Sequence, residues 1–100
     1  MQENASRKPE EVEQFLESTL DSVDAAEELA VAMAQRAGLD EDELMKVGMA
    51  IRESVVNAVV HGNRYNANKK VHFSVSTDAE RFVVQVGDEG EGSGLISETQ

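Results

Sequence analysis

The segment of residues 50–62 constrains this chain more than any other. Its sequence is Ala-Ile-Arg-Glu-Ser-Val-Val-Asn-Ala-Val-Val-His-Gly, in which Glu53, Asn57 and His61 each follow the last by four residues. Positions four apart lie on the same face of an α-helix. A helix here therefore presents a carboxylate, an amide and an imidazole on one side.

The other residues of this region are mostly apolar. At about 100° per residue they form two groups, which are Leu44, Val47, Ile51, Val55, Ala58 and Val59 on one side and Met45, Met49, Val56 and Val60 on another. A helix that is apolar nearly all round is normally buried. We therefore expect Glu53 and Asn57 to lie in a partly dry place, where a polar group needs a metal ion, a water molecule or a ligand as partner. For either residue alone, a polar stripe facing solvent is the simpler interpretation.

Composition limits the classes of protein to consider. The chain has 100 residues, of which 40% are hydrophobic and 29% charged, which indicates one small globular domain. We expect residues 1–11 to form a loose arm and residues 12–100 the domain. The net charge of −11 argues against direct nucleic-acid or membrane binding. The absence of cysteine and of any apolar run of about 18 residues favours a cytoplasmic protein.

Two helices are predicted from periodicity and capping patterns. Residues 12–20 could be an edge strand or the start of a helix, and we favour the strand. The first clear helix begins near Ser22 or Asp24, where Asp24 and Glu27 have the spacing of a capping pair, and it ends at Gly38. The same spacing recurs where the second helix begins, at residues 40–43, and that helix ends at Gly62.

Two strands follow a loop at residues 63–69. Apolar residues occupy alternate positions in each strand, namely Val71, Phe73 and Val75 in the first and Phe82, Val84 and Val86 in the second. A turn at residues 77–80 makes the strands antiparallel. His72 has the parity of the solvent face and is expected to be an ordinary surface residue. Two helices over a small, mainly antiparallel sheet give an α+β two-layer sandwich.

Asp88 continues the parity of the buried residues in the second strand, so its carboxylate is expected to point toward the helices, where it needs a hydrogen-bond donor. Gly90, Gly92 and Gly94 follow it at alternate positions. Glycine lets the backbone approach a ligand closely and leaves N–H groups free for an anion. An Asp at the end of a core-facing strand followed by this loop therefore predicts a binding site.

Taken together, residues 50–62 and Asp88-x-Gly90-x-Gly92 resemble the N box and the first glycine box of the histidine-kinase-like ATPase fold, also called the GHKL or Bergerat fold. Residues 50–62 are most similar to the anti-sigma factors that are protein serine kinases. The resemblance runs from about Thr19 to Gly92. It implies an ATP-binding domain that uses Mg²⁺.

The resemblance also implies roles for single residues. Asn57 would bind the Mg²⁺ that bridges the phosphates, and Glu53 would act as general base or orient the attacking hydroxyl group. Asp88 would accept the adenine amino group, with Gly90 and Gly92 beside the nucleotide. These roles suit the residue types, because an amide oxygen is acceptable to Mg²⁺ and an ionised carboxylate only accepts hydrogen bonds.

His61 has two interpretations that the sequence does not separate. It could contact the phosphates of the nucleotide, or it could interact favourably with the dipole of the helix at its C-terminal end.

The implied function is that of an ATP-dependent protein serine/threonine kinase. Such a protein sequesters a sigma factor and phosphorylates a STAS-domain anti-anti-sigma factor, and a homodimer is common in the resembled family. Its members also have a second glycine-rich box that holds the phosphates, and we find none after Gly94, so the domain is expected to be incomplete at its C-terminus. The alternative function is a non-catalytic regulatory module that keeps the fold for partner binding and has lost full ATP binding.

Overall fold

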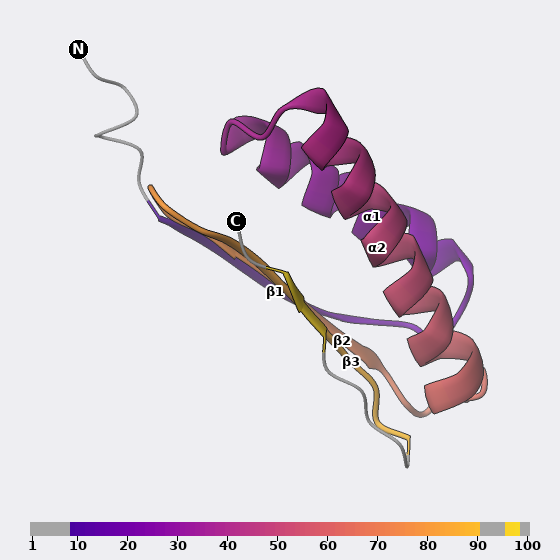
Figure 1. The fold of residues 1–100 in the computed structure, drawn as a ribbon. Helices are drawn as coiled ribbons and strands as arrows, with labels where there is room; N and C mark the ends of the chain where they lie inside the picture. The colour runs from indigo at the N-terminus through magenta and orange to yellow at the C-terminus, as the bar shows by residue number, and fades with distance from the viewer. Residues whose placement is uncertain (1–8, 91–95, 99–100) are drawn as a thin grey trace.

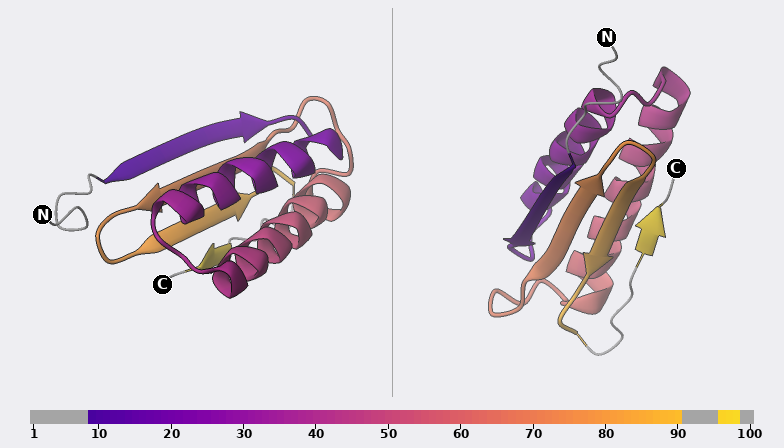
Figure 2. Two further views of the ribbon diagram at one scale, coloured as in Figure 1. Left: turned by 90° about the horizontal axis from the view of Figure 1, so that it is seen from above. Right: turned by 90° about the vertical axis from the view of Figure 1, so that its left-hand side faces the viewer.

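The computed structural model describes residues 9–90 and 96–98 and has two layers, a sheet and a pair of helices (Figure 1). The described sheet has four antiparallel strands in the order β1-β2-β3-β4. Both helices are inserted between β1 and β2 and cover one face of the sheet (Figure 2). The elements are β1 (Glu10–Leu16), α1 (Asp21–Arg36), α2 (Glu41–Val56), the π-helix η2 (Asn57–Gly62), β2 (Val71–Thr77), β3 (Phe82–Gly87) and β4 (Ile96–Glu98). The predicted α+β sandwich is confirmed.

The core lies between the helices and the sheet. Alternate residues of β2 and β3 enter it, and these are Val71, Phe73, Val75, Phe82, Val84 and Val86. The register places Phe73 opposite Val86 and Val75 opposite Val84, so the two strands form one apolar surface. Each such side chain stabilises the fold by about 1.5–3 kcal/mol when it is fully buried. The predicted alternation of both strands is confirmed.

Strand β1 resolves the ambiguity in the N-terminal region in favour of a strand. It pairs antiparallel with β2, with Leu16 opposite Val71, and ends before the predicted limit at residue 20. It begins at Glu10, inside the stretch that we expected to be a loose arm. Residues 1–8 of that arm lie outside the described part of the chain.

The predicted N-terminal cap of the first helix is wrong. Helix α1 begins at Asp21 after Leu20, which makes no side-chain capping bond. Asp24 and Glu27 lie within the helix, and their carboxylates instead accept hydrogen bonds from Arg52 of α2. The C-terminal prediction is confirmed, because Gly38 has a φ of 94° directly after the last turn. Only a residue without a Cβ adopts that left-handed geometry easily.

Helix α2 begins as predicted. The Asp40 carboxylate accepts a hydrogen bond from the Glu43 backbone N–H at 2.9 Å, and the Glu43 side chain accepts one from the Asp40 N–H at the same distance. The second apolar group was overestimated, because Met45 and Met49 are 65% and 66% exposed. The sheet and α1 cover only one side of α2, and these two methionines lie beyond that side. Among the described residues, no helix is both long and apolar enough to cross a membrane.

Candidate functional site

The C-terminal end of η2, at Gly62, meets the loop that follows β3, and the contact is made by two glycines. A Cβ atom placed on Gly62 would lie 2.1 Å from Oδ2 of Asp88, and one placed on Gly90 would lie 1.8 Å from the carbonyl oxygen of Gly62. Both distances are far below van der Waals contact, so neither position has room for a larger residue. The two motifs singled out in the sequence are therefore in contact at this junction.

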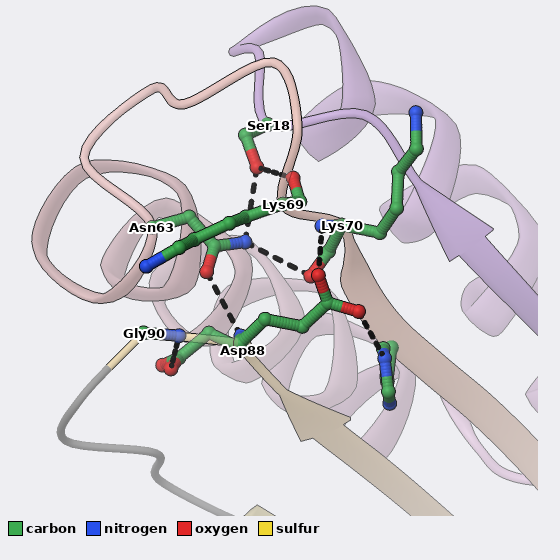
Figure 3. Close-up of polar contacts among 8 residues, drawn as sticks. Ser18, Asn63, Lys69, Lys70, Asp88 and Gly90 are labelled. Carbon is green, nitrogen blue, oxygen red and sulfur yellow. Dashed lines mark hydrogen bonds and ion pairs between the residues drawn. The ribbon is translucent and has the colours of Figure 1, made fainter.

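The Asp88 carboxylate occupies the centre of the junction. It follows the strand that buries Phe82, Val84 and Val86, and it is half-buried, with Oδ2 against the backbone of Gly62. The expected donor is the N–H of Gly90, which donates to Oδ1 at 2.9 Å (Figure 3). A carboxylate has about four lone-pair directions. Asp88 therefore keeps capacity to accept a further hydrogen bond from a ligand.

The three polar residues of the helix do not lie in a dry place. Glu53, Asn57 and His61 are all exposed, and our expectation of partial burial was wrong for the first two. The reason is their position on the helix, because the buried residues Ile51 and Val55 face the core and the polar stripe lies on the opposite side. Glu53 and Asn57 are four residues apart across the end of α2, so they share one accessible face.

His61 lies in a segment that is wound differently from α2. Residues 57–62 are wound as a π-helix, and the N–H of Asn63 donates to the carbonyl of Ala58, five residues earlier, at 2.8 Å. A step of four residues stays close to one full turn in either winding, so His61 remains roughly on the side of Asn57. Single π turns of this kind occur often at functional sites.

Asn63 is a residue of this site that sequence reasoning missed. It is 2% exposed, and its Nδ2 donates to Oγ of Ser18 and to the carbonyl of Lys70, both at 2.9 Å. Its Oδ1 accepts from the N–H of Glu89 at 2.8 Å. Figure 3 shows these bonds joining three segments that are far apart in the sequence. The composition of residues 63–69 predicted only a polar loop. The one sequence signal that could have pointed to Asn63 was its position directly after Gly62.

Glu89 gives a second link between the end of β3 and the start of β2. Its side chain accepts from the backbone N–H of Lys70 at 2.9 Å and forms a hydrogen bond with Nε2 of His72 at 3.0 Å. The Lys70 N–H, followed by the His72 hydrogen bond, holds the pKa of the Glu89 carboxyl below its usual range. His72 is exposed as expected, but it also packs edge-to-face on Phe15 with ring centres 4.7 Å apart, so it is more than an ordinary surface residue.

The described part of the chain limits how a metal ion or cofactor could be held. Within residues 9–90 and 96–98, no group of three or more acidic or histidine side chains is placed to hold a metal ion. Mg²⁺ needs no such cage, since it usually keeps several waters and takes one or two protein ligands together with substrate phosphates. Asn57 can supply one amide oxygen. Arg52 forms ion pairs with Asp24 and Glu27, and Arg36 forms one with Glu10.

Two residues in the predicted glycine loop have different outcomes. Gly90 lies at the junction, where its backbone closely approaches the carbonyl of Gly62, and its predicted place beside a nucleotide stays a prediction. Gly92 lies outside the described residues, so its predicted role stays a prediction.

Comparison with known proteins supports this assembly of motifs. The model of a family described as the histidine kinase-like ATPase domain matches residues 16–99. Similar proteins include the anti-sigma F factors of Bacillus velezensis (strain DSM 23117 / BGSC 10A6 / LMG 26770 / FZB42) and of Bacillus subtilis (strain 168). Each is 35% identical over 51 residues, which is 51% of this chain and 35% of the relative. The match thus spans little more than a third of each relative's length.

Proposed function

Because the chain belongs to the histidine kinase-like ATPase domain family, we propose that it binds ATP and acts as an anti-sigma regulatory factor. The observation that carries the ATP-binding part is the junction of Gly62, Asp88 and Gly90. There a half-buried carboxylate with unused acceptor capacity lies against backbone that only glycine permits. The anti-sigma part is supported by the names of the two relatives.

Asp88 is the proposed acceptor for the exocyclic amino group of adenine. An ionised carboxylate cannot donate a hydrogen bond, so it favours a base that presents an amino group and disfavours one that presents a carbonyl oxygen at the same place. Gly90 and Gly92 would lie beside the nucleotide. The cradle formed by Gly62 and Gly90 fits this role, because it brings the backbone close to the carboxylate without a side chain in between.

The second part of the proposed site is the accessible face of the helix. Asn57 would supply a ligand to Mg²⁺, which neutralises phosphate charge when it is bound with ATP. Glu53, one turn earlier on the same face, would take or orient the proton of an attacking serine or threonine hydroxyl. His61, in the π turn, would contact the phosphate region. Phosphoryl transfer depends mainly on positioning and charge neutralisation, which this arrangement can provide.

The proposed biological role is to sequester a sigma factor in the cytoplasm and to phosphorylate a STAS-domain anti-anti-sigma factor that antagonises it. A homodimer would suit this role. The alternative is a non-catalytic module that binds partners through the same fold without full ATP binding. Such a module would not transfer phosphate to a STAS protein, which distinguishes it from the kinase.

Calorimetric titration with ATP, with and without Mg²⁺, tests the proposal. We expect saturable binding that depends on Mg²⁺ and is lost in Asn57→Ala. Asn68→Ala is the matched control, because Asn68 is an exposed amide in the loop outside the proposed site. Unchanged affinity in Asn57→Ala would contradict the role of Asn57, and absence of ATP binding by the folded chain would contradict the nucleotide site itself.

A further inference from the structure

The amide of Asn63 joins three segments of the chain at one buried point. Its nitrogen bonds to Ser18, in the connection between β1 and α1, and to the carbonyl of Lys70, at the start of β2. Its oxygen bonds to the N–H of Glu89, the residue directly after Asp88. All three bonds are between 2.8 and 2.9 Å, and the side chain is 2% exposed.

The orientation of this amide is fixed by its partners. Oγ of Ser18 donates to the carbonyl of Lys69, so it must accept from the Asn63 nitrogen. The carbonyl of Lys70 can only accept, and the N–H of Glu89 can only donate. Of the two orientations that exchange Oδ1 and Nδ2, only the observed one gives all three groups a suitable partner. A buried amide that is fully bonded in this way rigidifies the groups around it, because breaking any bond leaves a polar atom unsatisfied.

These bonds hold the backbone on both sides of the Asp88 carboxylate. The N–H of Asn63 closes the π turn by bonding to Ala58, which sets the position of Gly62 beneath Oδ2 of Asp88. The side chain of the same residue holds the N–H of Glu89, and therefore the peptide plane between Asp88 and Glu89. One residue thus fixes the carboxylate relative to the helix end and to its own strand.

We infer that Asn63 is a positioning residue that sets the preference of Asp88 for a purine base with an exocyclic amino group. The inference rests on the proposed ATP site and adds to it a residue that does not touch the base. If Asn63 is removed, the Asp88–Glu89 peptide loses its anchor and the carboxylate no longer meets the amino group in a fixed direction. None of the three hydrogen bonds of the Asn63 side chain reaches Glu53, Asn57 or His61, the residues proposed to act near the phosphates.

The test compares ATP with purine ribonucleoside triphosphate, which lacks the amino group, by calorimetric titration in the presence of Mg²⁺. Since a lost hydrogen bond to a charged group costs roughly tenfold in affinity or more, we expect the wild-type chain to prefer ATP by about that factor. In Asn63→Ala the preference should fall to within about twofold of unity, mainly through weaker ATP binding. Asn68→Ala, an equal truncation of an exposed residue in the same loop, should keep the wild-type preference.

A general loss of stability would weaken the binding of both nucleotides equally and leave the ratio of their affinities unchanged. A wild-type ratio in folded Asn63→Ala would therefore overturn the inference. Should Asn63→Ala not fold, Ser18→Ala removes one partner of the amide and is expected to lower the preference by about threefold. An unchanged ratio in that variant would count against the inference in the same way.

Amide hydrogen exchange separates this inference from the proposed function. If the wild-type chain binds both nucleotides equally or neither, the proposed role of Asp88 fails. Exchange still decides whether Asn63 anchors the loop, since Asn63→Ala should speed exchange at Glu89 and Gly90 much more than at Val84 in the middle of β3. A uniform acceleration over all three would overturn the anchoring role.

Discussion

At the scale of single residues, the contact between Gly62 and Asp88 leads to a direct prediction. In Gly62→Ala the new methyl group would lie 2.1 Å from Oδ2 of Asp88, so the carboxylate must move away from the helix end. We expect ATP affinity to fall by about tenfold or more, because the displaced carboxylate loses its hydrogen bond to adenine. Calorimetric titration measures the change, and wild-type affinity would contradict the proposed site.

Gly48→Ala is the matched control for this substitution. Its Cβ would lie 3.0 Å from Oε2 of Glu27, the far end of a flexible side chain, and 3.6 Å from Cγ2 of Val31, an ordinary van der Waals contact. Alanine is also a better helix former than glycine by about 0.8–1 kcal/mol. Stability should therefore be equal or greater in this variant, and nucleotide binding should not change.

A second prediction at this scale concerns Glu89 and pH. Its pKa is lowered from 4.5 in the folded protein, chiefly by the N–H of Lys70 and then by His72, so its ionised form stabilises the fold above that pH. This stabilisation is lost as pH falls through the lowered pKa. Glu89→Gln should therefore unfold at lower urea concentration than wild type near about pH 6, and the difference should shrink toward about pH 3. A difference that grows toward low pH would contradict the assignment.

Single residues also differ in how well the sequence predicts them. The direction of Asp88 follows from the two-residue period of a strand, so its place beside the helix could be predicted. The role of Asn63 could not be predicted, because its three bonds come from Ser18, Lys70 and Glu89, which only the folded chain brings together. The burial of Glu53 was predicted wrongly, since periodicity does not say which side of an apolar helix the rest of the domain covers.

At the scale of secondary structure, the capping box of α2 gives a stability prediction. Asp40→Ala removes the acceptor for the Glu43 N–H and leaves that donor without its partner. We expect the free energy of unfolding to fall by about 1 kcal/mol. Urea denaturation measures this change. Asp24→Ala is the comparison, because Asp24 is exposed and forms a surface ion pair with Arg52, whose loss costs about 0–1 kcal/mol. A larger effect at Asp24 than at Asp40 would contradict the assigned caps.

Local signals explain why the elements themselves were predicted better than the site. The alternation in β2 and β3, the capping box and the C-terminal Gly38 depend on neighbouring residues, and all are confirmed. The start of α1 depends on Leu20, which provides no side-chain signal, so a capping pattern farther along the helix was chosen instead. The π winding at residues 57–62 likewise has no local sequence signature that we used.

At the scale of the whole molecule, the net charge of −11 predicts how salt affects stability. Excess like charge destabilises the compact state, and salt screens that repulsion. Raising sodium chloride from about 20 mM to about 500 mM should therefore raise the thermal midpoint. A variant with Glu28→Lys and Glu80→Lys, two exposed positions, gains four units of charge to reach −7 and should depend less on salt. A midpoint that falls with added salt would contradict the prediction.

The order of the strands has a consequence for the path by which the chain folds. Strands β2 and β3 are neighbours in sequence, but Leu16 of β1 meets Val71 of β2 only after the chain has passed through both helices. Closing so long a loop costs entropy before its contacts are formed. We therefore expect the helix pair and the β2–β3 hairpin to assemble first and β1 to join last. On this path Ser18, which follows β1, would reach Asn63 only in the final step, so formation of the Asn63–Ser18 hydrogen bond would mark the end of folding.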